Sequence, residues 1–121
     1  MNKEIKIVLS EDANKQYDDL VDVVGEELKK GAEGSFHQSL LRAIDRIKEL
    51  LRKNPFLGTQ IHKKAIPKIY VQKYGIENLW RIELPKRWRL LYSIEGSEIE
   101  IINFIIDFFD HKFYDKIFKY K

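Results

Sequence analysis

Arg81 and Arg89 lie in a stretch where large apolar residues recur at every second position. This alternation predicts two strands joined by a turn at 85–87, with both arginines on the face opposite the apolar side chains. Arginine suits phosphate because its planar group donates two hydrogen bonds and stays charged. In the expected register Glu83 lies opposite Arg89 and neutralises it. The pattern therefore indicates either a phosphate-binding face or an ordinary solvated sheet face.

A second pair of candidates lies near the end of the sequence. His111 and Tyr114 are three residues apart in a segment predicted to be the last helix, so they share one helix face. Histidine can transfer protons near neutral pH, and tyrosine can donate a hydrogen bond or stack on a base. The alternative is a surface histidine beside a tyrosine that packs the helix on the sheet. The histidines have no metal-ligand spacing and there is no cysteine, so we expect neither metal nor cofactor.

Positive charge gathers in one segment. Residues 62–92 carry eight basic side chains and two acidic ones. Such clustering points to a polyanionic partner. Trp80 and Trp88 fall on the apolar face, so we expect them in the core and not as base-stacking platforms. The candidate phosphate contacts are Lys63, Lys64, Lys68, Lys86 and Arg87, although a solvated loop explains the first three equally well.

The elements that must position these residues follow from periodicity. A strand is predicted at 4–9, followed by two amphipathic helices in an antiparallel hairpin. Ser10 and Ser35 are the expected N-caps, and Leu28 belongs to the apolar face of the first helix. Further strands are predicted at 69–74, 80–84, 88–94 and 98–106, the last apolar on both faces and therefore central. The whole of 1–121 is thus expected to be one α+β domain with an antiparallel sheet and a short last helix.

The stretch from Tyr74 to Tyr92 resembles the RelE/ParE toxin superfamily of type II toxin–antitoxin systems, and 110–118 is similar to its C-terminal signature. The order of strand, helical hairpin and β-meander is also similar to that family's fold, although the first half matches only in topology. The resemblance, nearest to the RelE branch, implies a metal-independent endoribonuclease (an mRNA interferase) that cuts mRNA in the ribosomal A site. In that reaction a ribose 2′-hydroxyl attacks the adjacent phosphate, and basic side chains stabilise the developing charge.

The resemblance assigns catalytic roles by position. Arg89 and Tyr114 match family residues, Arg81 matches a basic position, and His111 is the nearest candidate for proton transfer. Glu83 departs from the pattern, because RelE has a lysine there. A carboxylate at this position repels a scissile phosphate, or it acts as a base.

The resemblance also implies partners: a cognate antitoxin in a hetero-oligomer, the ribosome and mRNA. A cytoplasmic location with no membrane partner is expected, since no apolar run is long enough to span a bilayer. Two other functions stay open. One is a ParE-like toxin that binds DNA gyrase and cuts nothing. The other is a non-toxic protein that keeps only antitoxin binding.

Overall fold

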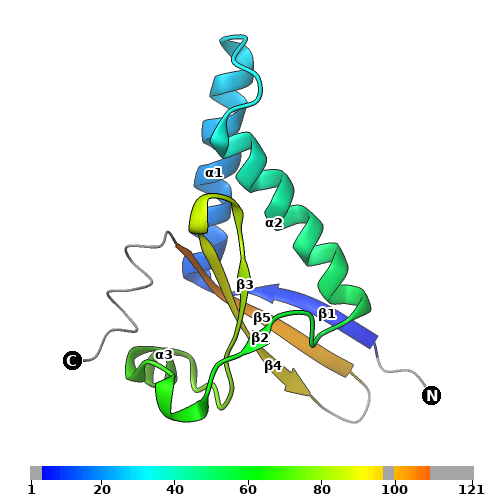
Figure 1. Cartoon of the computed structure of the whole chain (residues 1–121), viewed down its shortest axis with the longest axis vertical. Coiled ribbons are helices and arrows are strands. Elements are labelled where there is room, and N and C mark those ends of the chain that lie inside the picture. Colours follow the sequence, from blue (N-terminus) through cyan, green and yellow to red (C-terminus); the bar gives the residue numbers. More distant parts are fainter. Residues whose placement is uncertain (1–3, 97–99, 110–121) are drawn as a thin grey trace.

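A five-stranded sheet lies at the centre of the computed structural model, which describes residues 4–96 and 100–109. Two long helices form a hairpin that projects beyond the sheet, and a third, short helix lies at the other end of the molecule (Figure 1). The predicted α+β class is confirmed. The strands are β1 (Glu4–Leu9), β2 (Thr59–Gln60), β3 (Trp80–Glu83), β4 (Arg89–Gly96) and β5 (Glu100–Phe109).

The strand order is β1-β5-β4-β3-β2. β3, β4 and β5 pair in antiparallel fashion, as predicted, and β2, which was not predicted from the sequence, pairs antiparallel to β3, but β1 runs parallel to β5. The expectation of a wholly antiparallel sheet is therefore wrong at this strand. The chain between these two parallel strands runs through both long helices, the short helix and the other three strands, so the local pattern of 4–9 does not reveal the pairing.

The two long helices are α1 (Glu11–Lys29) and α2 (Phe36–Lys53). Both predicted N-caps are confirmed, because the Ser10 hydroxyl accepts from the Ala13 N–H and the Ser35 hydroxyl accepts from the Gln38 N–H. The prediction for Leu28 is wrong: its side chain is exposed, since α1 there projects past the sheet that would cover it. Within residues 4–96 and 100–109, no helix is long and apolar enough to cross a membrane.

The segment predicted as a strand at 69–74 is instead a helix, α3 (Lys68–Tyr74). Ile69 and Val71 gave the appearance of alternation, but both are exposed. The buried contact is made by Tyr70, and Tyr74 stacks on it one turn later with ring centroids 6.3 Å apart. Helical spacing of the aromatic residues therefore decided the local structure.

Apolar residues cover the sheet on both faces. On one face the sheet packs against α1 and α2 through Leu40, Ile44 and Tyr92, with Trp80 and Trp88 partly buried beside this cluster. The placement of both tryptophans in the core is thus confirmed. On the other face a smaller cluster joins α3 to β4 and β5, formed by Tyr70, Ile76, Leu79, Leu91 and Ile106. β5, hydrogen-bonded to β1 and β4, is an interior strand of the sheet, as its composition predicted, although β4 holds the middle place.

Gly58 offers a test of how the α2–β2 loop is held. A Cβ atom at this position would lie 2.5 Å from the Arg81 carbonyl oxygen, which belongs to the sheet backbone. Because that atom cannot move aside, we expect Gly58→Ala to lower the free energy of unfolding by about 1–3 kcal/mol, measured by urea denaturation. Gly25 on α1 is the matched control, since a Cβ there meets nothing within 4 Å. Gly25→Ala should raise stability by about 0.5–1 kcal/mol, and equal stability of the two variants would contradict this account.

Candidate functional site

The sheet face turned away from α1 and α2 carries both candidate arginines, and we call it the arginine face. Arg81 pairs with Leu91 and Glu83 pairs with Arg89 in the β3–β4 register. Cross-strand partners point to the same side of a sheet, so Arg81, Glu83 and Arg89 share this face. The two arginines are diagonal neighbours, a relation that places Cα atoms at about 7–8 Å. The predicted register and shared face are therefore confirmed.

Arg89 is held firmly by its surroundings. Its Nη1 donates to the Arg87 carbonyl oxygen at 2.6 Å and lies 3.0 Å from the Glu83 carboxylate. The side chain of Arg89 is 13% exposed, whereas that of Glu83 is 61% exposed. The guanidinium is thus mostly buried, while the carboxylate that neutralises it is mostly exposed to solvent. Any anionic ligand at this guanidinium would have to compete with Glu83 for the same donor.

Lys86 and Arg87 form the predicted turn between β3 and β4, within a short 3-10 helix at Pro85–Arg87. Both have positive φ, 53° for Lys86 and 66° for Arg87. For residues other than glycine this conformation costs about 1 kcal/mol or more. The Lys86 ammonium lies 5.2 Å from the centre of the Phe36 ring at the start of α2. This turn therefore places the Lys86 ammonium beside the start of α2.

Lys63, Lys64 and Lys68 are exposed at the other end of the sheet. The first two lie in a short 3-10 helix at Lys63–Ala65, and Lys68 begins α3. The β3–β4 turn and α3 lie at opposite ends of the β3–β4 pair (Figure 1). The structure therefore divides the five predicted phosphate contacts into two separate groups, one at each end of the arginine face.

Asp107 is a titratable residue that sequence reasoning missed. It pairs with Leu91 on the arginine face, and its carboxylate accepts a hydrogen bond of 3.0 Å from the Tyr70 hydroxyl. Burial raises the pKa of Asp107, although hydrogen bonds from Gln16 and Tyr70 act in the opposite direction. Burial and the adjacent Asp107 also raise the pKa of Tyr70. The available signal was a single carboxylate inside the apolar run Ile105-Ile106-Asp107-Phe108-Phe109.

Asp12, in the first turn of α1, holds α3 from its other side. Lys73 Nζ and the Tyr74 hydroxyl lie 2.5 and 2.6 Å from the same Asp12 oxygen. These hydrogen bonds lower the pKa of Asp12. Two carboxylates thus dock α3 on the sheet, a buried one whose pKa is raised and an exposed one whose pKa is lowered.

The remaining candidates do not join this face. His111 and Tyr114 lie outside the described residues. His37 binds Glu27 at the outer end of the helical hairpin, with 2.8 Å between Nδ1 and Oε2, and His62 accepts from the Lys64 N–H. Among the described residues, no three histidine or acidic side chains are placed to bind a metal ion.

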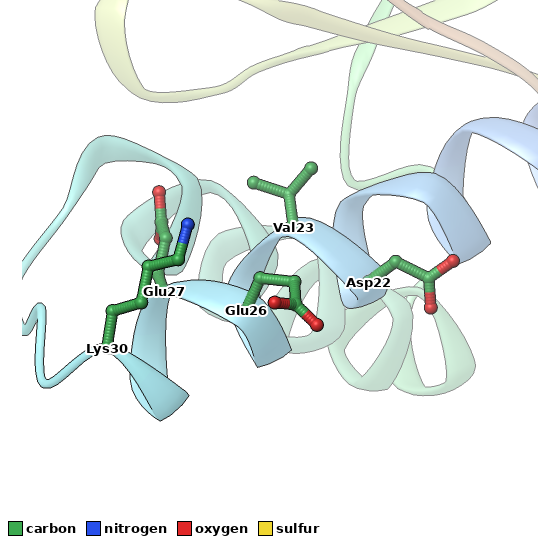
Figure 2. A pocket seen from close by; sticks show the side chains of 5 residues that line it. All are labelled: Asp22, Val23, Glu26, Glu27 and Lys30. Carbon is green, nitrogen blue, oxygen red and sulfur yellow. The ribbon is translucent and has the colours of Figure 1, made fainter.

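An open hollow lies beside the outer half of α1. Figure 2 shows that a single helix supplies its lining, formed by Asp22, Val23, Glu26, Glu27 and Lys30. Three of the five are acidic, which disfavours an anionic ligand. Glu27 also accepts from Ser35 and His37, which lowers its pKa and ties α1 to the start of α2. We assign this hollow to the hairpin's own packing.

Comparisons of the chain with protein-family models, with curated proteins and with solved structures found no match.

Asp107 makes stability depend on pH in a direction that can be checked. Between the ordinary carboxyl pKa and the raised one, the folded chain holds a proton that the unfolded chain has released, so stability falls as pH rises through this window. Asp107→Asn removes that cost and keeps an acceptor for Tyr70. We therefore expect the melting temperature of Asp107→Asn minus that of the unmodified chain to become more positive as the pH rises from about 4 to about 8.

Asp12→Asn is the control of opposite sign. The lowered pKa of the Asp12 carboxyl contributes stability at neutral pH that is lost on acidification. The Asp12→Asn variant should therefore melt slightly below the unmodified chain at neutral pH and match it in acid. A constant difference for Asp107→Asn across the pH range would refute the buried-carboxylate account.

Proposed function

We propose that this chain is a RelE-like toxin of a type II toxin–antitoxin pair, acting as a ribosome-dependent mRNA endonuclease. The observation that carries the proposal is the arginine face, where Arg81 and Arg89 share one side of the β3–β4 pair and Arg89 is fixed at 13% exposure. The likeness of 74–92 and 110–118 to the superfamily supplies the reaction class. The proposed location is the cytoplasm.

The arginine face suits cleavage by the RNA's own hydroxyl. In this reaction the 2′-oxygen forms a bond to the adjacent phosphorus and the bond from phosphorus to the 5′-oxygen breaks. The products are a 2′,3′-cyclic phosphate and a free 5′-hydroxyl. Negative charge builds on the phosphate oxygens in the transition state, and Arg81 and Arg89 stabilise it from fixed positions. Such stabilisation works best when the donors need no rearrangement during the reaction.

Two protons must move in this reaction. Glu83 is our candidate for accepting the proton of the 2′-hydroxyl, because its carboxylate is exposed and lies 3.0 Å from Arg89. Release of Glu83 from Arg89 when phosphate binds would place a free carboxylate beside the reacting group. His111 is the proposed donor to the departing 5′-oxygen, and Tyr114 a proposed contact to the RNA.

The ion pair between Glu83 and Arg89 also favours a second candidate function. A guanidinium already neutralised by a carboxylate binds phosphate less strongly, which fits a ParE-like toxin that binds DNA gyrase and cleaves nothing. Either toxin requires a cognate antitoxin that forms a hetero-oligomer with it. DNA damage with intact messages after induced expression would favour the gyrase alternative.

Arg89→Ala tests the main proposal. Loss of one preorganised donor should reduce cleavage of ribosome-bound mRNA about 100-fold, mapped by primer extension in a reconstituted translation system. Arg89→Lys keeps the charge but not the paired hydrogen bonds, so it should retain intermediate activity. Lys15→Ala is the matched control, since Lys15 is an exposed cation on α1 whose ammonium pairs with the exposed Asp19 on the same helix. Full activity of Arg89→Ala with an unchanged melting temperature would refute the endonuclease proposal.

Glu83→Gln separates a base from a simple neutralising partner. If Glu83 accepts the 2′-hydroxyl proton, the substitution should slow cleavage about 100-fold while mRNA binding is retained or improved. The measurement is single-turnover cleavage at saturating ribosomes. Faster cleavage by Glu83→Gln would show that the carboxylate only competes with phosphate for Arg89.

A further inference from the structure

Phe56, in the loop between α2 and β2, is an exposed aromatic residue with a built support. Phe56 is 60% exposed, yet its ring packs on the Trp80 ring, with the ring centroids 5.6 Å apart and the planes at 58°. Trp80 in turn stacks on Tyr92, which is fully buried, at 6.2 Å and 26°. Three aromatic rings thus run from the surface to the core, and the outermost has most of its area open to solvent.

The loop that carries Phe56 is fixed by hydrogen bonds. The buried Tyr92 hydroxyl donates to the Pro55 carbonyl oxygen at 2.9 Å and accepts from the Gly58 N–H at 3.0 Å. The Asn54 side chain accepts from the Phe56 N–H at 3.0 Å. An aromatic ring held in this way loses little conformational entropy when a ligand stacks on it. The loop is therefore preorganised to display the ring.

The charge around Phe56 indicates the kind of ligand. Residues 50–76 contain six lysines and arginines and no aspartate or glutamate. Lys53 precedes the ring, and Lys63 and Lys64 follow β2; all three are exposed. Basic residues that flank an exposed ring in the sequence suit the phosphates and unpaired bases of a single nucleic-acid strand. An apolar peptide that docked here would not require so long a segment without acidic residues.

We propose that Phe56 is a stacking platform for one unpaired base of a single-stranded nucleic acid, with Lys53, Lys63 and Lys64 contacting its phosphates. The platform lies beside the edge strand β2, where Gln60 pairs with Trp80 and Thr59 pairs with Arg81. Adjacent residues of β2 therefore border the platform and the arginine face. A strand that crosses this edge reaches Arg81 directly. This inference rests on the proposed function and extends it, because it gives the RNA substrate a second contact outside the cleavage site.

The test is binding of a fluorescently labelled oligouridylate of about eight nucleotides, followed by anisotropy without ribosomes. Base–aromatic stacking predicts that Phe56→Leu weakens binding about tenfold, whereas Phe56→Tyr keeps the ring and stays within about twofold. Ile69→Ser is the matched control, because Ile69 is an apolar residue of similar exposure, 58%, but it is aliphatic and lies on α3. It should bind as the unmodified chain does. In a Trp88→Phe background, binding should also change the emission of Trp80.

Further ligands separate stacking from charge and RNA from DNA. Inorganic polyphosphate should bind the unmodified chain and Phe56→Leu equally, because it has no bases. A matched DNA single strand that also depends on Phe56 would assign the site to unpaired bases in general, and an RNA-only dependence would assign it to RNA; both support stacking. Phe56→Leu binding as tightly as the unmodified chain, or a duplex binding as well as a single strand, would overturn the inference.

The two proposals fail separately. Phe56-dependent binding without cleavage of ribosome-bound mRNA would keep the stacking platform and reject the endonuclease. Cleavage that depends on Arg89, together with binding that is unchanged by Phe56→Leu, would keep the endonuclease and reject the stacking platform. Melting temperatures of the Phe56 variants should match that of the unmodified chain, since most of the ring is exposed.

Discussion

The hydroxyl of Tyr92 connects the buried centre of the sheet to the chain that leaves α2. Its two hydrogen bonds, to Pro55 and from Gly58, satisfy loop backbone groups that would otherwise face an apolar interior. Its ring also supports Trp80. The loop consequently enters β2 at one fixed place, with Gly58 packed directly against the Arg81 carbonyl. This single side chain therefore helps to position the edge strand β2, the exposed ring of Phe56 and one border of the arginine face.

The two faces of the sheet differ in the size of their apolar clusters and in the charged side chains that they carry. The face under the helical hairpin holds the larger apolar cluster, whereas the arginine face combines a small cluster with ionised groups. That face carries two carboxylates in neighbouring rows of the sheet: Glu83 neutralises Arg89, and Asp107 is held by Tyr70. An uncompensated buried guanidinium would be costly, so Glu83 stabilises the empty face.

The sequence predicted best where burial is one-sided and local. The alternation through β3 and β4 placed Arg81 and Arg89 correctly, because with a period of two the burial of Trp80 and Trp88 puts the arginine after each of them on the opposite face. It failed at α3, where Pro67 before the first turn and Gly75 at φ 65° were the informative signals. The parallel pairing of β1 and the role of Asp107 depend on distant neighbours, and no local pattern encodes those.

The pairing of β1 with β5 governs when the domain assembles. Ser10 donates its hydroxyl to the Ile106 carbonyl, 96 residues further along the chain. Closing so long a loop costs entropy before any contact compensates, so this contact forms late, after the local helical hairpin. β4 likewise lacks a neighbour on one side until β5 exists. A chain under synthesis therefore cannot complete the sheet that carries Arg81 and Arg89 until Phe109 has left the ribosomal exit tunnel.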